Sequence, residues 1–263
     1  MSSREDNVFM AKICEQTERF DDMVRYMKLV AESDNKQLSI EDRNLLSVAY
    51  KNAIGPHRTA WRALTSIETK EEAKSSKQLP LLRDYKGKIE AELDKFCQEI
   101  LNLLEHTLVP NAGDNEEKVF YLKMKGDYHR YMAEYASEAA QKEIGKLAEK
   151  AYCEAKEIAE AHLKTTHPIR LGLALNSSVF YYEVMSDPTK ACQMAKSAFD
   201  EAIADIEQLD DDEAFMESLK LRHVASNFDD LARKLQHRFD DLPVLSILLS
   251  NAIGCSSDVS NIY

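Results

Sequence analysis

The sequence predicts an all-α fold, and three features of the 263-residue chain lead to this prediction. Glycine and proline are scarce, at seven and six residues, so turn residues and helix breakers are few. Good helix formers such as Ala, Leu, Glu and Lys recur throughout. Apolar residues recur at helical spacing from the start, at Phe9, Ile13, Phe20, Met23, Met27 and Val30. The apolar content of 44% is enough to form a sizeable core.

Amphipathic helices are expected over the first sixty residues. The pattern Ser39-x-x-Asp42 signals the start of a long helix that runs through Trp61 and Ile67. Pro56 lies in the middle of this helix, where it removes one backbone donor and crowds the residue four positions earlier. We therefore expect a bend or a local break at this proline.

The rest of the chain is divided into helices by polar and proline-containing segments. A polar stretch at about 70–77 predicts a turn, and a helix over 81–108 is expected to end at the segment Pro110-Asn-Ala-Gly113. Pro168 and Pro188 are placed to occupy the first turns of two later helices. The later helices are expected at about 115–137, 141–164, 168–185, 188–206 and 213–239. The count is about nine helices in one domain, because no Gly- or Ser-rich linker and no fixed-period repeat divides them.

Composition and charge argue against several classes of protein. Acidic residues outnumber basic ones by 46 to 34, so the formal charge of −12 repels nucleic acid and anionic membranes unless basic residues cluster locally. The five cysteines are scattered and form no C-x-x-C pair, as is typical of reduced thiols in a cytosolic protein. The longest apolar stretch, Leu242–Gly254, is too short for a membrane span, and no signal or transit peptide is recognisable. We expect a soluble protein with no nucleic-acid partner and no membrane insertion.

No pattern for catalysis or for metal binding is found. The chain lacks G-x-S-x-G, a Gly-rich phosphate loop, H-E-x-x-H and any Cys/His metal spacing. His162 and His167 are five residues apart, which is poor geometry for a shared metal, so we assign them capping or solvated roles. We expect no enzyme activity, no metal and no cofactor.

Positively charged residues are stacked along two of the expected helices. Lys51 and Arg58 are seven residues apart, and Arg62 follows one turn later, so helical geometry places three cations on one stripe. On a later helix, Lys123 precedes Arg130 by seven residues. Such columns are disfavoured by repulsion unless an anion neutralises them.

Two kinds of anion are compatible with these columns. Tyr131 places a phenol hydroxyl beside Arg130, and two arginines, a lysine and a tyrosine suit a phosphate dianion, because a guanidinium binds phosphate oxygens in pairs. The alternative is a solvated charged stripe neutralised by Asp127 and Glu134. Spacing alone favours this alternative.

Three long segments resemble the signature segments of 14-3-3 proteins. They are RNLLSVAYKN at 43–52, KVFYLKMKGDYHRY at 118–131 and THPIRLGLALN at 166–176, with weaker similarity through 178–183 and 198–203. The similarity covers about residues 4–210. It implies an all-α domain of about nine antiparallel helices that has a concave groove and forms a two-fold dimer.

The resemblance also implies roles for individual residues. Lys51, Arg58, Arg130 and Tyr131 match positions that bind the phosphate of a phosphoserine or phosphothreonine segment, and Asn176 matches one that holds the peptide backbone. Other matched groove positions are Lys123, Leu175, Val179, Glu183 and Asn227. An ordinary core role is the alternative for Leu175 and Val179. The first helices of one subunit are expected to pack on the third and fourth helices of the other, with Arg19 and Asp22 facing Glu92 and Lys88.

The chain departs from the family pattern in three places. Gly-Pro-His-Arg replaces the usual Gly-Ala-Arg-Arg, so His57 stands where an arginine is usual. Ala60 replaces a phosphorylatable serine that many animal members carry before Trp61, so control of dimerisation by phosphorylation there is not expected. In the last expected helix, His223 and Asp230 occupy positions that are usually apolar in the groove, and an apolar tail replaces the usual acidic one.

The expected organisation is a 14-3-3-like helical domain over 1–240 and an atypical apolar tail over 241–263, with the chain from about Phe228 ordered against the protein's own helices. The expected function is that of a dimeric adaptor that binds phosphorylated client proteins and regulates their activity, localisation or assembly. It is expected to form a homodimer or a heterodimer with paralogues, in the cytoplasm or also in the nucleus. The alternative is a helical scaffold whose degenerate groove no longer reads phosphate.

Overall fold

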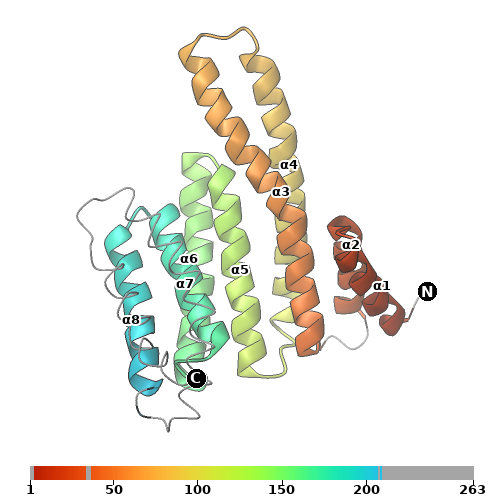
Figure 1. Ribbon diagram of the computed structural model, residues 1–263, viewed down its shortest axis with the longest axis vertical. Coiled ribbons are helices and arrows are strands. Elements are labelled where there is room, and N and C mark those ends of the chain that lie inside the picture. The colour runs from red at the N-terminus through yellow and green to blue at the C-terminus, as the bar shows by residue number, and fades with distance from the viewer. Residues whose placement is uncertain (1–2, 34–36, 207, 209–263) are drawn as a thin grey trace, which may run out of the picture. The chain divides into compact units, whose positions relative to one another are not determined.

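The computed structural model describes residues 3–33, 37–206 and 208, which form eight α-helices and no strand (Figure 1). The expectation of an all-α fold is confirmed. The chain divides into two compact units, Met1–Ala151 and Tyr152–Tyr263, which are described one at a time. The helix expected at 213–239, the groove residue Asn227 and the apolar tail lie outside the described residues.

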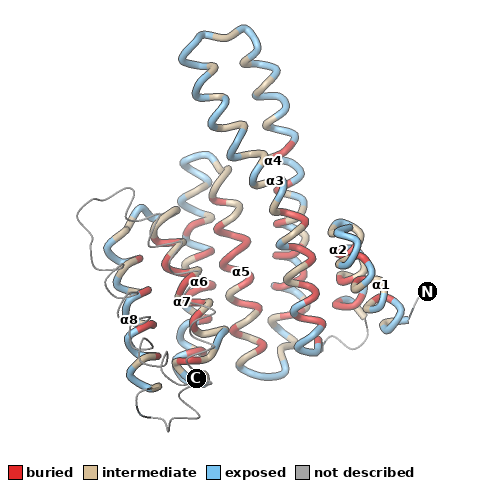
Figure 2. Tube along the Cα trace, in the orientation of Figure 1, coloured by how far each residue is buried: buried red, intermediate tan, exposed pale blue. Residues whose placement is uncertain are grey.

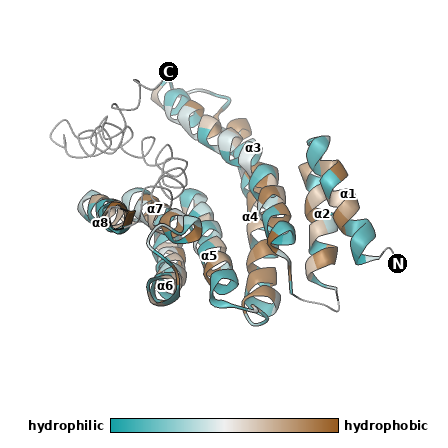
Figure 3. Ribbon diagram, turned by 60° about the horizontal axis from the view of Figure 1, so that its bottom comes forward, coloured by the Kyte–Doolittle hydropathy of each residue, from teal (hydrophilic) through white to brown (hydrophobic). Residues whose placement is uncertain are grey.

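The first unit consists of successive helices that pack side by side from α1 to α5. They are α1 (Arg4–Gln16), α2 (Phe20–Ala31), α3 (Ile40–Ala73), α4 (Leu79–Leu103) and α5 (Asn115–Tyr135), followed by the first part of α6 (Glu138–His162). A short π-helix, η1 (Leu104–Leu108), extends α4. Each helix carries both polar and apolar residues, as the alternating teal and brown ribbon of Figure 3 shows. One face of each helix can therefore enter the core while the other meets water.

Side-chain caps fix where several of these helices begin. Ser39 accepts a hydrogen bond from the backbone N–H of Asp42 at 3.1 Å, and the Asp42 carboxylate accepts one from the backbone N–H of Ser39 at 3.3 Å. The start of α3 predicted from the Ser-x-x-Asp pattern is thus confirmed as a capping box. Ser3 and Asp6 form the same motif at α1, and Asp114 caps α5.

The local break expected at Pro56 is wrong, because α3 continues through this residue without interruption. The proline leaves the carbonyl of Asn52 without its helical N–H donor. Pro56 is exposed and Asn52 half-buried, so water has access to that carbonyl. Ala53 and Ile54 are buried in the core just before the proline and hold the helix in place.

The core of the first unit lies at one end of its two long helices. Tyr50 and Leu46 on α3 are fully buried together with Met23 and Met27 on α2, whereas residues 55–88 include no buried side chain. Figure 2 shows the contrast between the buried lower part of the α3–α4 hairpin and its exposed tip. Within one subunit, this part of the hairpin therefore has no fully buried core of its own.

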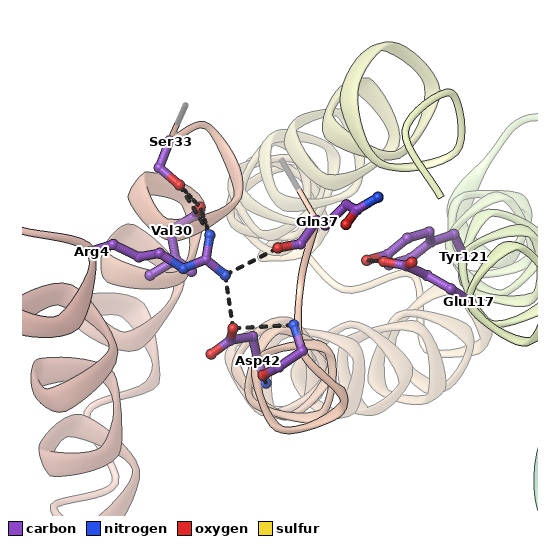
Figure 4. Close-up of polar contacts among 8 residues, drawn as sticks. Arg4, Val30, Ser33, Gln37, Asp42, Glu117 and Tyr121 are labelled. Atoms are coloured by element: carbon purple, nitrogen blue, oxygen red, sulfur yellow. Dashed lines mark hydrogen bonds and ion pairs between the residues drawn. The ribbon is translucent and has the colours of Figure 1, made fainter. Parts of the chain in front are cut away.

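Arg4 joins α1 to the start of α3. Its guanidinium donates to the Asp42 carboxylate at 2.8 Å, to the Ser33 hydroxyl at 3.1 Å and to the Gln37 carbonyl at 3.2 Å (Figure 4). The Asp42 side chain is only 10% exposed. A buried carboxylate needs such a partner, because an unpaired buried charge is costly.

The second unit contains the rest of α6 with α7 (Pro168–Glu183) and α8 (Pro188–Ile206). Both helices begin at the predicted prolines, and the backbone N–H of Ile169 donates to His167 Nδ1 at 3.2 Å. The capping role expected for His167 is therefore confirmed. Leu171 on α7 and Phe199 on α8 are buried against each other's helix.

Within the described part of the chain, no helix is long and apolar enough to cross a membrane. The same part holds no cluster of three or more potential metal ligands. Among the described residues, the cysteines at 14, 97, 153 and 192 are free thiols.

Candidate functional site

Arg58 on α3 and Arg130 on α5 converge on the ring of Tyr131. The guanidinium carbon of Arg58 lies 3.8 Å from the ring centroid, and that of Arg130 lies 4.7 Å from it. Both distances are within the range in which a cation is attracted to an aromatic face. The structure therefore brings together three of the four side chains that the sequence assigned to phosphate binding.

The two arginines are held largely away from water. The side chain of Arg130 is 8% exposed and that of Arg58 is 19% exposed. Burying a guanidinium is costly unless an anion accompanies it. The cluster must therefore contain carboxylates or bind an anion from outside.

Glu134, one turn after Arg130 on α5, supplies one such carboxylate. Arg58 donates to it through Nε at 3.1 Å and through a second, shorter contact from Nη2. Arg62 donates to the same carboxylate at 2.8 Å. Glu134 is thus shared by two cations of the α3 stripe.

Asp127, three residues before Arg130 on α5, supplies a second carboxylate. Lys123 donates to it at 3.0 Å, and Arg130 lies 3.7 Å from it. The ion pairs of the cluster thus join four cations, Arg58, Arg62, Lys123 and Arg130, to two carboxylates. Several cations thus converge near one ring, and such a group is compatible with a phosphoserine, which carries a charge of about −1.5 to −2.

Glu134 and Arg58 are both ionised at neutral pH. Burial opposes ionisation of Glu134, but the hydrogen bond and the charge of Arg58 outweigh it, so the pKa of Glu134 lies below its ordinary value. Burial likewise lowers the pKa of Arg58, and the hydrogen bond and charge of Glu134 reverse this effect, leaving the pKa raised. Both groups therefore remain ionised.

Two further tyrosine rings pack in succession against Tyr131. Tyr128 meets Tyr131 edge-on at a centroid distance of 5.3 Å, and Tyr50 meets Tyr128 in the same way at 6.3 Å. Tyr50 in turn donates its hydroxyl to Glu99 at 2.9 Å. Edge-to-face rings in a packed core have little freedom to move, so the Tyr131 ring is held in one orientation.

Lys51, the fourth residue assigned to phosphate, lies apart from these contacts. It is exposed on α3, two helical turns and about 10 Å before Arg58. In the described part of the chain it forms no ion pair. A lysine side chain is long enough to reach toward a ligand from this position. The role of Lys51 in phosphate binding stays a prediction.

The groove residues of α7 belong to the second unit. Leu175 is buried in the core between α7 and α8, and Val179, four residues later, is half-buried beside it. Asn176 and Glu183 are also half-buried. Their role opposite Arg58 stays a prediction, as does that of Asn227, which lies outside the described residues.

Three of the four residues assigned to the dimer interface have ionisable partners within their own subunit. Arg19 binds Asp22 through Nε at 2.6 Å. Glu92 and Lys88 are exposed on α4, and Glu92 lies 3.2 Å from His57. The pairing of these charges across a dimer stays a prediction.

Two contacts of the site region were missed at the level of sequence. The sharing of Glu134 between Arg58 and Arg62 joins residues 72 and 76 positions apart, and the contact of His57 with Glu92 joins α3 to α4. Helical spacing reveals neighbours three or four residues apart, but it cannot reveal which turns of two helices face each other. The only available signal was the presence of acidic residues near the basic columns.

Comparison with known proteins adds independent evidence. A family model described as "14-3-3 protein" matches residues 10–228, and this range spans both units. The chain is 56% identical over 211 residues to the 14-3-3-like protein GF14 psi of Arabidopsis thaliana, covering 80% of this chain and 83% of the relative. It is also 56% identical over 212 residues to a 14-3-3 protein homolog of Candida albicans, covering 80% of each. A 14-3-3 protein of Entamoeba histolytica is 54% identical over 208 residues, which cover 79% of this chain and 86% of the relative.

Proposed function

This chain belongs to the 14-3-3 family, and we propose on that basis that it is a dimeric adaptor that binds phosphoserine or phosphothreonine segments of client proteins. The observation that carries the proposal is the arrangement of Arg58 and Arg130 on the ring of Tyr131. Recognition of phosphorylated segments by arginine clusters is a general mode of binding, for which 14-3-3 proteins are an example.

The geometry suits a phosphate in three respects. The two guanidinium groups come from different helices, so each can turn two N–H donors toward the same anion. The Tyr131 hydroxyl adds one further donor. The clustered guanidinium groups attract a dianion, and Arg58 exchanges part of its contact with Glu134 for the phosphate.

The peptide around the phosphate is proposed to lie along a groove that α7 helps to line. Asn176 would bond the peptide backbone, with Leu175, Val179 and Glu183 beside it and Lys123 on the α5 side. Asn227 would be the second backbone contact. Substitution of usually apolar groove positions by His223 and Asp230 favours weaker selection for apolar side chains in the client.

A second copy of the chain is proposed to cover the tip of the α3–α4 hairpin. Leu81 and Tyr85 on α4 and Ile67 on α3 are 71%, 54% and 45% exposed, and no residue of this tip is buried within one subunit. On α1, Phe9 and Ile13 are also exposed. Packing α1 of each copy on the hairpin of the other would bury both faces by one two-fold operation.

The paired charges Arg19–Glu92 and Asp22–Lys88 would fix the register of that contact. Exposed ion pairs contribute only about 0–1 kcal/mol each, so the apolar residues supply most of the affinity. Two grooves on one dimer raise the affinity for doubly phosphorylated clients through effective concentration. The adaptor acts by holding, masking or bridging clients in the cytoplasm or nucleus, as a homodimer or with paralogues, and needs no catalysis or cofactor.

A titration with one Arg-x-x-Ser-x-Pro peptide, phosphorylated and unphosphorylated, tests the proposal. We expect at least tenfold tighter binding of the phosphorylated form, which corresponds to about 1.4 kcal/mol. Arg58→Ala and Arg130→Ala should each remove most of this difference, whereas Lys146→Ala, which removes an exposed cation of α6, should not. Equal binding of both peptides would favour the alternative, a scaffold whose groove no longer reads phosphate.

Light scattering tests the dimer separately. The expected mass is about twice the 30.0 kDa of one chain. A strictly monomeric protein at micromolar concentration would contradict this part of the proposal and leave phosphate binding unaffected.

A further inference from the structure

His57 contacts two hydrogen-bond acceptors at once. Its Nδ1 lies 3.0 Å from the carbonyl oxygen of Ala53 on the preceding turn of α3, and its Nε2 lies 3.2 Å from a carboxylate oxygen of Glu92 on α4. The imidazole ring also packs on Phe96 at a centroid distance of 5.6 Å. These contacts fix the ring between the two helices, with its side chain 23% exposed.

A neutral imidazole can satisfy only one of these two contacts. It carries a single N–H, whereas the carbonyl of Ala53 and the carboxylate of Glu92 both need a donor. The imidazolium carries an N–H on each nitrogen and can donate to both. Protonation of His57 therefore decides whether Glu92 receives a charged hydrogen bond within its own subunit.

Glu92 is the carboxylate that the proposed dimer pairs with Arg19 of the partner subunit. We propose that His57 is a proton-sensitive positioning residue of the dimer interface, which binds and neutralises Glu92 when protonated and leaves it available to the partner when neutral. This inference rests on the proposed dimer. His57 stands at a position where family members usually carry an arginine. The charge of an arginine does not change with pH in this range.

Several other charged groups on the helices packed against His57 form ion pairs elsewhere. On α2, Lys28 pairs with Glu99, and on α5 Glu134 pairs with Arg58 and Arg62. On α3 and α4, further ion pairs lie either near the hairpin tip or at the start of α3, and they involve Glu68, Glu71, Glu72, Lys74, Arg83 and Lys86 near the tip and Glu41, Asp42 and Arg43 at the start. Among these described ion pairs, Glu92 is thus the charged group that faces the ring.

Lys88 and Lys95 are two further charged residues near Glu92. Lys88 lies four residues before Glu92 on α4 and Lys95 three residues after it, and both are exposed. As a residue type, lysine titrates well above histidine, so neither lysine accounts for a response between pH 5 and 8. The pH response of the interface is therefore assigned to His57.

The sign of the response follows from the charges. Once protonated, His57 carries a positive charge beside Glu92. That charge competes with the incoming Arg19 of the partner subunit and repels it. Association should weaken in acid by about three- to fivefold, the size expected for one exposed ion pair.

The test is the dimer dissociation constant of the full chain, measured by sedimentation equilibrium at pH 7.5, 6.5 and 5.5 and constant ionic strength. The natural protein should show a dissociation constant about three- to fivefold higher at pH 5.5 than at pH 7.5. His57→Gln should dimerise equally at all three values and as tightly as the natural protein at pH 7.5. His57→Arg should also be independent of pH but as weak as the natural protein at pH 5.5.

Two controls separate this switch from general acid effects. His106→Gln alters an exposed histidine on η1 and should retain the full pH response. Glu92→Gln should dimerise weakly and without pH dependence, which keeps the test valid if His57→Arg does not fold. An unchanged pH response in His57→Gln, or equal dissociation constants for the Gln and Arg variants, would overturn the inference.

Phosphopeptide titration of the same samples distinguishes a failure of the proposed pH switch from a failure of the proposed dimeric adaptor. Phosphate-dependent binding by a dimer with no His57-dependent pH response would contradict the switch alone. A natural protein that is monomeric at every pH would contradict both the dimer and the switch.

Discussion

The guanidinium of Arg58 stacks on the ring of Tyr131, with 3.8 Å between the guanidinium carbon and the ring centroid. Arg130 contacts the same ring, so one aromatic side chain orients two cations from different helices. Tyr131 is half-buried and is backed by Tyr128. The tyrosine therefore has two separable roles in the proposed site, one through its ring and one through its hydroxyl.

Replacing Tyr131 by phenylalanine and by leucine should separate these roles. Tyr131→Phe keeps the ring and removes one hydrogen bond to the phosphate, so phosphopeptide affinity should fall by about tenfold. Tyr131→Leu also removes the ring and should cost at least a further threefold, because a cation–π contact contributes about 0.5–2 kcal/mol. Fluorescence anisotropy with a labelled phosphopeptide measures both affinities. Equal affinities of the Phe and Leu variants would show that the ring does not orient the arginines.

Glu134→Gln should increase phosphopeptide affinity by about three- to tenfold. The carboxylate shares Arg58 and Arg62, so it competes with an incoming phosphate, and the neutral amide keeps the shape while removing the competing charge. Glu143→Gln, which removes an exposed carboxylate paired with Lys146 on α6, is the matched control and should leave affinity unchanged. A tenfold loss in Glu134→Gln would instead show that Glu134 is needed to position Arg58.

Sequence reasoning predicted the helix starts because they depend on local spacing. The assignment of Arg58, Arg130 and Tyr131 to phosphate binding came from the resemblance to 14-3-3 proteins and stays a prediction. The cap at Ser39 and the start of α7 at Pro168 are each set by residues within four positions, so they can be read from the sequence alone. The continuity of α3 at Pro56 could not be predicted in this way. It depends on burial of the preceding turn and on solvent access to one carbonyl.

Contacts between distant helices were beyond prediction for the same reason. Glu134 was recognised only as a possible neutralising charge on a solvated stripe, whereas the structure places it on Arg58 in a site that is largely buried. His57 was recognised as a departure from the family pattern, but its contact with Glu92 depends on which turns of α3 and α4 face each other. The spacing of residues within one helix does not determine which of its turns faces a given turn of the neighbouring helix.

Arg4→Ala should destabilise the protein by about 1–3 kcal/mol and also weaken dimerisation. The substitution leaves the buried Asp42 carboxylate without its cation and frees α1, which carries part of the proposed interface. Lys12→Ala is a matched control, because Lys12 pairs with Glu41 between the same two helices but both side chains are exposed, at 41% and 65%. The control should change stability by less than about 1 kcal/mol. Thermal unfolding and light scattering measure the two effects, and similar losses in both variants would contradict the assignment to burial.

His129 on α5 should make the protein sensitive to acid. Burial is the main cause that lowers the pKa of His129 to about 4, and the charge of Lys125 adds to it, while Glu105 acts in the opposite direction. Within the described part of the chain, the buried Nδ1 has no hydrogen-bond partner. The folded protein therefore keeps this imidazole neutral over a range in which an unfolded histidine, with its pKa near 6.5, is protonated.

The direction of the effect on stability follows from proton binding. Between pH 6.5 and pH 4 the unfolded chain binds a proton at residue 129 that the folded chain does not, so unfolding becomes easier as the pH falls through this window. The full loss is on the order of 3 kcal/mol below pH 4, from about 1.4 kcal/mol per pKa unit. His129→Phe preserves a planar ring and removes the titration, so its melting temperature should fall less between pH 6.5 and pH 4 than that of the natural protein. His106→Gln, at an exposed position, should keep the natural pH dependence. Parallel melting curves for His129→Phe and the natural protein across this window would show that His129 does not set the acid sensitivity.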